Sequence, residues 1–298
     1  MTRILLTIPA LTASAMAQNW VNFADETTAR MRVAGNDPSI TVNDTQEKDY
    51  AWGDVDLDGD IDLVCVRKQP FTSAGRDTNI LFMNEGVAEG HAINGVLMDR
   101  TADYVVDSDV QGDEGFLTPT NDRDVVLADL NGDGWLDMAT APTLTDNSQK
   151  HLSHPRIYIN QGESGGVWQG FRFEDARIPE MHPTAGPRFC SVAAGDVDGD
   201  GDLDLYFGDY DSGGSQIFDY NNRLLINNGS GFFTDETNSR LTGEMSLSAF
   251  GAASAIADMN GDGVMDVVKQ TSLNAPQHVA VTYNNPSNEG VFNRYDIV

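Results

Sequence analysis

Short apolar runs, bounded by polar and glycine-rich segments, recur along the whole chain. One type of run follows a strongly acidic segment, as in Leu63–Val66 and Leu205–Phe207. A second type ends in asparagine, as in Ile80–Asn84 and Arg156–Asn160. Runs of this length between turn residues predict β-strands, and no segment shows a long helical period. The pattern therefore predicts an all-β protein.

The predicted strands fall into units of four. A strand precedes each acidic segment, as in Val125–Ala128 and Ser191–Ala194, and a last strand closes the unit, as in Leu97–Thr101, Phe173–Asp175 and Phe233–Thr237. The unit recurs about every 60 to 75 residues, a period typical of repeat architectures. Four-stranded units repeated around an axis are the pattern of a β-propeller, with four repeats visible in this chain.

A strand of the last type is also predicted at each end of the chain, at Phe23–Thr27 and within Val291–Val298. A closed ring of four blades needs that strand only once. The repeat therefore predicts either a four-bladed ring with a spare strand or part of a larger ring.

Each unit contains one acidic loop of nine residues in which positions 1, 3, 5 and 9 are Asp or Asn and position 6 is Gly. Position 7 varies, as expected of a residue that contributes only its backbone carbonyl. The predicted ligand positions are Asp54, Asp56, Asp58, Asp60 and Asp62; Asp129, Asn131, Asp133, Trp135 and Asp137; Asp196, Asp198, Asp200, Asp202 and Asp204; and Asp258, Asn260, Asp262, Val264 and Asp266.

Calcium is the metal that this pattern favours. Ca²⁺ takes six to eight oxygen ligands from closely spaced carboxylates and carbonyls, whereas Mg²⁺ demands tight octahedral geometry. Zinc and other soft metals would lack their usual Cys and His ligands here. Asp, Asn and Gly also favour ordinary turns, but four matches in phase with a longer repeat argue against merely acidic turns. We expect about four calcium ions.

The EF-hand loop begins in the same way but needs a bidentate carboxylate at position 12 and flanking helices. Position 12 is Cys65, Thr140, Phe207 or Lys269 in the four loops. None of these side chains can chelate calcium bidentately, so the EF-hand interpretation fails.

The four loops match the pattern Asp-x-[Asp/Asn]-x-Asp-Gly-x-x-Asp without a substitution and resemble the FG-GAP/VCBS repeat family. The resemblance covers roughly residues 20–298. It implies a calcium-binding β-propeller, as in integrin α subunits, whose rings close with seven blades; four repeats would then be part of such a ring. Such propellers host many functions, so the resemblance does not define an activity.

The N-terminus predicts a secretory signal peptide at residues 1–17, followed by the repeats at 18–298. Arg3 is followed by the short apolar stretch Ile4–Thr12 and by Ala15 and Ala17 at the positions that a signal peptidase inspects. We therefore expect a secreted or cell-surface protein, extracellular or periplasmic. The 46 acidic and 18 basic residues give a net charge of −28, which argues against nucleic acid and anionic lipid as partners.

Two cysteines, Cys65 and Cys190, are too few for a disulfide framework. Buried free thiols are the favoured interpretation, and a disulfide between them is the alternative.

The leading functional hypothesis is a non-catalytic adhesion or binding module for an extracellular protein or glycan. Long connections opposite the acidic loops, such as Lys68–Thr78 and Gly208–Asn222, are predicted to form the binding surface. A propeller-based polysaccharide lyase or hydrolase is the enzymatic alternative, although no compact catalytic motif is present. An architectural spacer is a third possibility.

Overall fold

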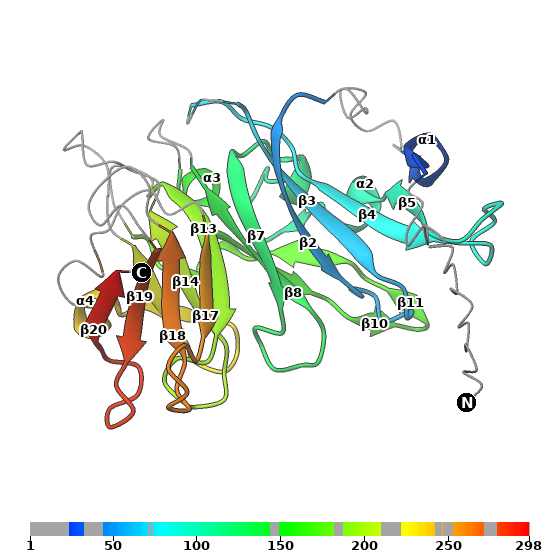
Figure 1. Cartoon of the computed structure of the whole chain (residues 1–298). Coiled ribbons are helices and arrows are strands. Elements are labelled where there is room, and N and C mark those ends of the chain that lie inside the picture. The colour runs from blue at the N-terminus through cyan, green and yellow to red at the C-terminus, as the bar shows by residue number, and fades with distance from the viewer. Residues whose placement is uncertain are drawn as a thin grey trace, which may run out of the picture.

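The computed structural model describes residues 24–32, 44–70, 72, 74–143, 149–181, 187–209, 222–241, 246, 253–270 and 279–297. Apart from a two-stranded hairpin, their strands form four sheets that follow one another in chain order from one side of the molecule to the other (Figure 1). Each of the four sheets contains four antiparallel strands, to which the first two sheets add a short parallel strand, and the helices are single turns. The all-β fold and the four-stranded repeat are therefore confirmed.

The first sheet contains β2 (Glu47–Gly53), β3 (Asp62–Lys68), β4 (Ile80–Glu85) and β5 (Val96–Asp99), and β1 (Met31–Arg32) pairs with β5 in parallel. The second contains β7 (Asp122–Ala128), β8 (Asp137–Pro142), β9 (Arg156–Asn160) and β12 (Phe171–Phe173), with β6 (Asp107–Ser108) parallel to β12. A small hairpin of β10 (Glu163–Ser164) and β11 (Val167–Trp168) lies between β9 and β12 in the chain.

The third sheet contains β13 (Phe189–Gly195), β14 (Asp204–Asp209), β15 (Arg223–Asn227) and β16 (Phe233–Asp235). The fourth contains β17 (Ser254–Ala257), β18 (Asp266–Gln270), β19 (Val279–Asn284) and β20 (Phe292–Ile297). The helical turns are α1 (Thr27–Arg30), α2 (Thr101–Tyr104), η1 (Gly115–Leu117), α3 (Lys150–Ser153), η2 (Asp175–Arg177) and α4 (Thr237–Arg240).

The last strand of each unit ends two residues earlier than predicted in the first three sheets. Thr101 and Thr237 begin helical turns, because an Asp two residues earlier accepts hydrogen bonds from the threonine N–H and hydroxyl. Asp175 likewise begins η2. The strand predicted at Phe23–Thr27 is wrong in its described part, since residues 24–26 are irregular and Thr27 begins α1; Phe23 lies outside the described residues.

Three hydrophobic clusters join consecutive sheets. The first cluster packs Val64 and Leu81 against Val125 and Met138 of the second sheet, and similar clusters join the second sheet to the third and the third to the fourth. The first strand of each sheet contacts that of the next, in the order β2, β7, β13, β17. The described sheets form an open row, so closure into a ring stays a prediction (Figure 1).

The acidic loops all lie at one end of the sheets, because each joins the first strand of a sheet to its second strand (Figure 1). The strand ends that the connections between second and third strands join lie at the opposite end, where the predicted connection Lys68–Thr78 is described except at residues 71 and 73. The predicted connection Gly208–Asn222 lies outside the described residues over 210–221, so the separation from the metal loops is seen only for the described part of the long connections.

Candidate metal centres

The acidic loops are built by carboxylates that accept hydrogen bonds from the loop's own backbone. In the second loop the Asp129 carboxylate accepts from the N–H groups of Gly132, Asp133 and Gly134, at 2.8, 3.1 and 2.9 Å. Gly134, at position 6, has a φ of 92°, which a side chain would disfavour. Position 1 has the same role in the other loops, where the N–H at position 6 also donates to it. The sequence spacing thus produces one compact turn four times.

The Asp at position 9 ties each loop to the sheet. Asp204 accepts hydrogen bonds from the N–H of Val197 within the loop, at 3.0 Å, and from that of Asn227 at the end of the third strand, at 2.9 Å. The equivalent residues Asp62, Asp137 and Asp266 make the same pair of bonds. A position predicted from sequence as a metal ligand therefore also fixes the fold around the site.

Burial raises the pKa of three of these carboxyls, Asp62, Asp137 and Asp204, to about 7, although the two backbone hydrogen bonds oppose the change. Burial also raises the pKa of Asp266. A carboxylate with a raised pKa is poorly solvated and is stabilised by a nearby cation. A bound metal ion would therefore stabilise the charged form of the position-9 carboxyls.

Two loops bring three carboxylates together. One oxygen each from Asp54, Asp56 and Asp58 lies within 4.8 Å of the others, and the same holds for Asp196, Asp198 and Asp204. Within the described part of the chain, Asp54 Oδ1 and Asp198 Oδ1 are buried without a hydrogen-bond partner. Buried oxygens that lack a donor fit a hard cation, because they are strong acceptors removed from water.

The loops divide into two types at position 3. Loops 54–62 and 196–204 have Asp there and are named the Asp-type loops; loops 129–137 and 258–266 have Asn and are named the Asn-type loops. In the Asn-type loops the position-3 amide donates to the position-5 carboxylate, from Asn131 to Asp133 at 2.9 Å and from Asn260 to Asp262 at 3.0 Å. In the Asp-type loops burial and a neighbouring carboxylate raise the pKa of Asp56, to about 6, and that of Asp198.

The variable position 7 shows why the sequence tolerates different residues there. The N–H groups of Asp60, Trp135, Asp202 and Val264 all donate to the Asp at position 5, which any residue can do. Their carbonyls stay the predicted metal ligands. The Trp135 side chain has a place outside the loop, against Gly162, where an added Cβ would lie 3.2 Å from its Nε1.

Asparagines at the ends of the third strands join consecutive sheets, a role that the sequence did not reveal. Asn160 Nδ2 donates to the Val55 carbonyl of the preceding loop at 2.7 Å. Asn227 makes the same bond to Leu130 at 2.7 Å, and Asn284 makes it to Val197 at 2.6 Å. The repeated terminal Asn was visible in the sequence, but its acceptor lies in another repeat. Each of the first three metal loops is therefore held by the sheet that follows it.

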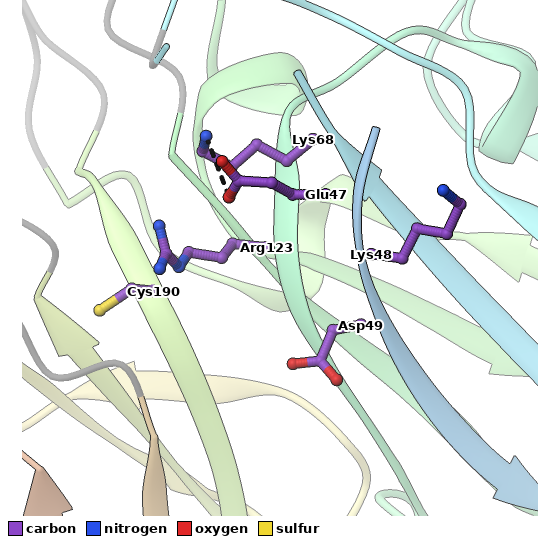
Figure 2. A pocket seen from close by; sticks show the side chains of 6 residues that line it. All are labelled: Glu47, Lys48, Asp49, Lys68, Arg123 and Cys190. Carbon is purple, nitrogen blue, oxygen red and sulfur yellow. Dashed lines mark ion pairs between the residues drawn. The ribbon is translucent and has the colours of Figure 1, made fainter. Parts of the chain in front are cut away.

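A small cavity of about 150 Å³ lies at the opposite end of the first strands, lined by Glu47, Lys48, Asp49, Lys68, Arg123 and Cys190 (Figure 2). Lys68 Nζ lies 3.5 Å from the Glu47 carboxylate, and burial lowers the pKa of Lys68. Burial raises the pKa of Cys190 to about 12, so the thiol is protonated at neutral pH and is no thiolate nucleophile. Sequence reasoning placed long connections here but did not identify this charged lining.

A larger, open groove of about 460 Å³ lies beside the second loop. It is lined by Trp135, Gln161, Glu163, Glu174 and Arg177, among others. Arg177 pairs with Glu174 at 2.7 Å and donates to the Ser230 carbonyl of the third sheet at 2.6 Å. The groove therefore combines an indole, carboxylates and an amide at the edge between two sheets.

Both cysteines are buried and free, in agreement with the favoured interpretation. Among the described residues, no helix is long and apolar enough to span a bilayer. The predicted signal peptide lies outside the described residues.

Residues 129–207 match the family model of the FG-GAP-like repeat. This match confirms the resemblance to the FG-GAP/VCBS repeat family that the acidic loops indicate. No curated protein matches the chain. Similar solved structures include an Agrocybe aegerita lectin studied for recognition of non-reducing terminal N-acetylglucosamine, with 15% identity, a TM-score of 0.36 and coverage of 85% of this chain and 66% of the lectin. The biofilm matrix protein Bap1 of V. cholerae has 14% identity and a TM-score of 0.32, with 84% and 39% covered. The chain thus spans less than two thirds of either protein.

Proposed function

We propose that the chain is a secreted, calcium-binding module of the β-propeller type. The observation that carries the metal assignment is the pair of buried carboxylate oxygens without a donor, Asp54 Oδ1 and Asp198 Oδ1, in loops that gather three carboxylates. Calcium would be held by the carboxylate and amide oxygens at positions 1, 3, 5 and 9 and by the carbonyl at position 7. Bound there, it would neutralise the crowded charge and fix the turn between the first two strands.

The test is calorimetric titration of the chelator-treated chain with calcium, with thermal unfolding followed in parallel. About four bound ions and a higher melting temperature support the proposal, with dissociation constants of about 0.1 to 1 mM as in extracellular modules. No binding in millimolar calcium would refute it. Magnesium at the same concentration is the control and should bind much more weakly.

We further propose that the module is non-catalytic and binds an extracellular glycan. The groove beside the second loop supports this assignment, because an indole can stack on a sugar ring while carboxylates and amides bond its hydroxyls. Trp135, Glu163 and Gln161 would supply these contacts. A protein ligand is the alternative partner.

Screening of the calcium-loaded chain against immobilised glycans tests the binding role, followed by titration of the best ligand. Trp135→Ala should weaken binding about tenfold or more, as expected for an aromatic anchor. Trp52→Ala, which alters an exposed indole on the first sheet, is the matched control. Equal binding by both variants would contradict the groove assignment. Shortened or unsaturated products from a bound polysaccharide would favour the lyase or hydrolase instead.

A further inference from the structure

The two ends of the row of sheets carry the two halves of an interface that the molecule already uses three times. Between consecutive sheets, each hydrophobic cluster combines side chains from both neighbours. A fourth cluster, Leu63, Cys65, Ile80 and Phe82 with Met31 and Leu97, contains side chains of the first sheet alone among the described residues, and its four core members are at most 3% exposed within this chain. It lies on the face turned away from the second sheet, where Leu63 and Cys65 pair with Trp52 and Tyr50. On this face the side chains of Tyr50 and Trp52 are exposed, at 46% and 59%, so they offer the surface that a further sheet could cover.

In the second and fourth sheets, the residue two places before the acidic loop packs against the preceding sheet. Leu127 lies against Gly53, and Ile256 lies against Gly195, since a Cβ added to either glycine would meet the neighbouring side chain at 3.1 Å and 2.5 Å. Trp52 occupies this position in the first sheet and is 59% exposed. Its counterpart surface, equivalent to Gly53 and Gly195, is Ala257 on the fourth sheet.

The second loop position shows the same asymmetry at the other end of the row. Val55, Leu130 and Val197 are at most 1% exposed, because the following sheet covers them, whereas Met259 is 51% exposed. The carbonyls of the first three accept the inter-sheet bonds from Asn160, Asn227 and Asn284. Met259 offers the same carbonyl on the fourth sheet, which no described sheet follows.

Asn84 is the matching donor on the first sheet. In the described part of the chain its amide nitrogen donates only to the Ile61 carbonyl, at 3.1 Å, and its Oδ1 is buried without a donor. The other three asparagines add the inter-sheet bond to the equivalent contact with the residue before position 9. A fourth inter-sheet bond would therefore run from Asn84 to the Met259 carbonyl.

The helical turn α1 already stands where a preceding sheet would place one. Arg177 and Arg240, in the turns after the second and third sheets, reach the turn between third and fourth strands of the next sheet, at Ser230 and Gly290. Arg30 of α1 donates to the carbonyls of Asn94 and Gly95, in the equivalent turn of the first sheet. The first sheet thus carries part of the contact expected from a preceding neighbour.

We propose that the first sheet of one copy of this chain binds the fourth sheet of a second copy, head to tail, and repeats the inter-sheet interface between molecules. In this contact between two copies, Trp52 would pack against Ala257, and the Asn84 amide would donate to the Met259 carbonyl. Because the two surfaces differ, the contact is heterologous and yields a closed ring or a growing chain of copies. The net charge of −28 opposes association, so salt and calcium should promote it.

Sedimentation velocity of the calcium-loaded chain over a range of concentrations tests the proposal. The mass should rise above that of one chain with increasing concentration. Trp52→Gln and Met259→Gln should each weaken association about tenfold or more, since each removes a central apolar contact. Both residues are exposed, so the variants should keep the parent's unfolding temperature. Val167→Gln, at an exposed residue of the small β10–β11 hairpin, is the control and should associate normally.

Mixing the variants distinguishes a head-to-tail contact from other arrangements. Trp52→Gln blocks only the first sheet and Met259→Gln only the fourth, so each alone should stay a single chain while an equimolar mixture forms a dimer and nothing larger. If the first and fourth sheets instead close on each other within one chain, the parent should have the mass of a single chain at every concentration. That result would refute the proposal. Association of either variant alone as strong as the parent's would also refute it.

Discussion

The Asp-type and Asn-type loops share one backbone but differ in how they balance their charge. An Asn-type loop has three Asp ligand positions, and its position-3 amide donates to a neighbouring carboxylate. An Asp-type loop has five Asp, and each contains a buried carboxylate oxygen without a donor. The Asn-type loop therefore supplies part of its own compensation, whereas the Asp-type loop depends more on a cation from outside the loop, which Arg240 supplies in part by pairing with Asp198 at 3.0 Å. Ligand charge is one of the properties that set calcium affinity, so we expect two classes of site.

Among the tests of these two classes of site, removing calcium should have the largest effect on the stability of the chain. A site held at 100 times its dissociation constant contributes about 2.7 kcal/mol to the free energy of unfolding, so chelation should lower the melting temperature strongly. Titration back should fill the Asp-type loops before the Asn-type loops. Two resolved binding steps of about two ions each, measured by calorimetry, would support the division. Four equivalent sites would contradict it.

The second largest effect is expected from replacing a position-9 carboxylate, because this residue accepts the same two backbone hydrogen bonds in both types of loop. The position-9 carboxylate accepts one backbone N–H at each of its two oxygens. Asp204→Asn and Asp137→Asn each replace one of these oxygens with an NH2 group, which leaves one backbone N–H without an acceptor. The expected loss is about 1 to 3 kcal/mol even without calcium, measured by chemical denaturation in chelator. Asp202→Asn, at a half-buried position of the same third-sheet loop, is the control and should change stability much less. Equal losses of stability in Asp202→Asn and Asp204→Asn would contradict the conclusion that the Asp204 carboxylate holds the loop to the sheet.

Exchanging position 3 sharpens the comparison directly. Asn131→Asp should convert an Asn-type loop to the other type and strengthen calcium binding there, while Asp56→Asn should weaken it, each by a few-fold, about 1 kcal/mol. In chelator the effects on stability should reverse, since the added carboxylate is then uncompensated. Calcium titration and unfolding of both variants provide the measurement. Changes of the same sign with and without calcium would argue against this account.

The position-9 carboxyls also predict a pH dependence. Asp62, Asp137 and Asp204 have folded-state pKa values raised to about 7, so the calcium-free fold favours their protonated forms. The resulting stability is complete below the ordinary carboxyl range and is lost as pH rises through about 7. In chelator the melting temperature should therefore fall from about pH 5 to about pH 8, whereas saturating calcium, which binds the deprotonated forms, should remove or reverse the trend. A calcium-free chain that gains stability over this range would contradict the interpretation.

The sequence predicted the repeat well because the information is local. An apolar run between turn residues specifies a strand, and the spacing of Asp196, Asp198 and Asp204 specifies a loop in which carboxylates converge. It could not show where Asn160 donates, because the Val55 carbonyl belongs to another repeat. Nor could it show that Thr101 leaves the strand, since the Asp99 bonds that turn the chain compete with sheet pairing. The same limit applies to Trp52, whose exposure depends on a neighbouring sheet rather than on its own strand.

The asparagine contacts also bear on how such a chain can change by duplication. Each sheet meets the next through the same pieces, an Asn amide on one and a loop carbonyl on the other. A repeat gained or lost within the row would bring together surfaces that already fit, and no new contact would have to arise at the junction. The length of the row is therefore free to vary, because every repeat carries both a metal loop and an asparagine that can bond the loop of the repeat before it.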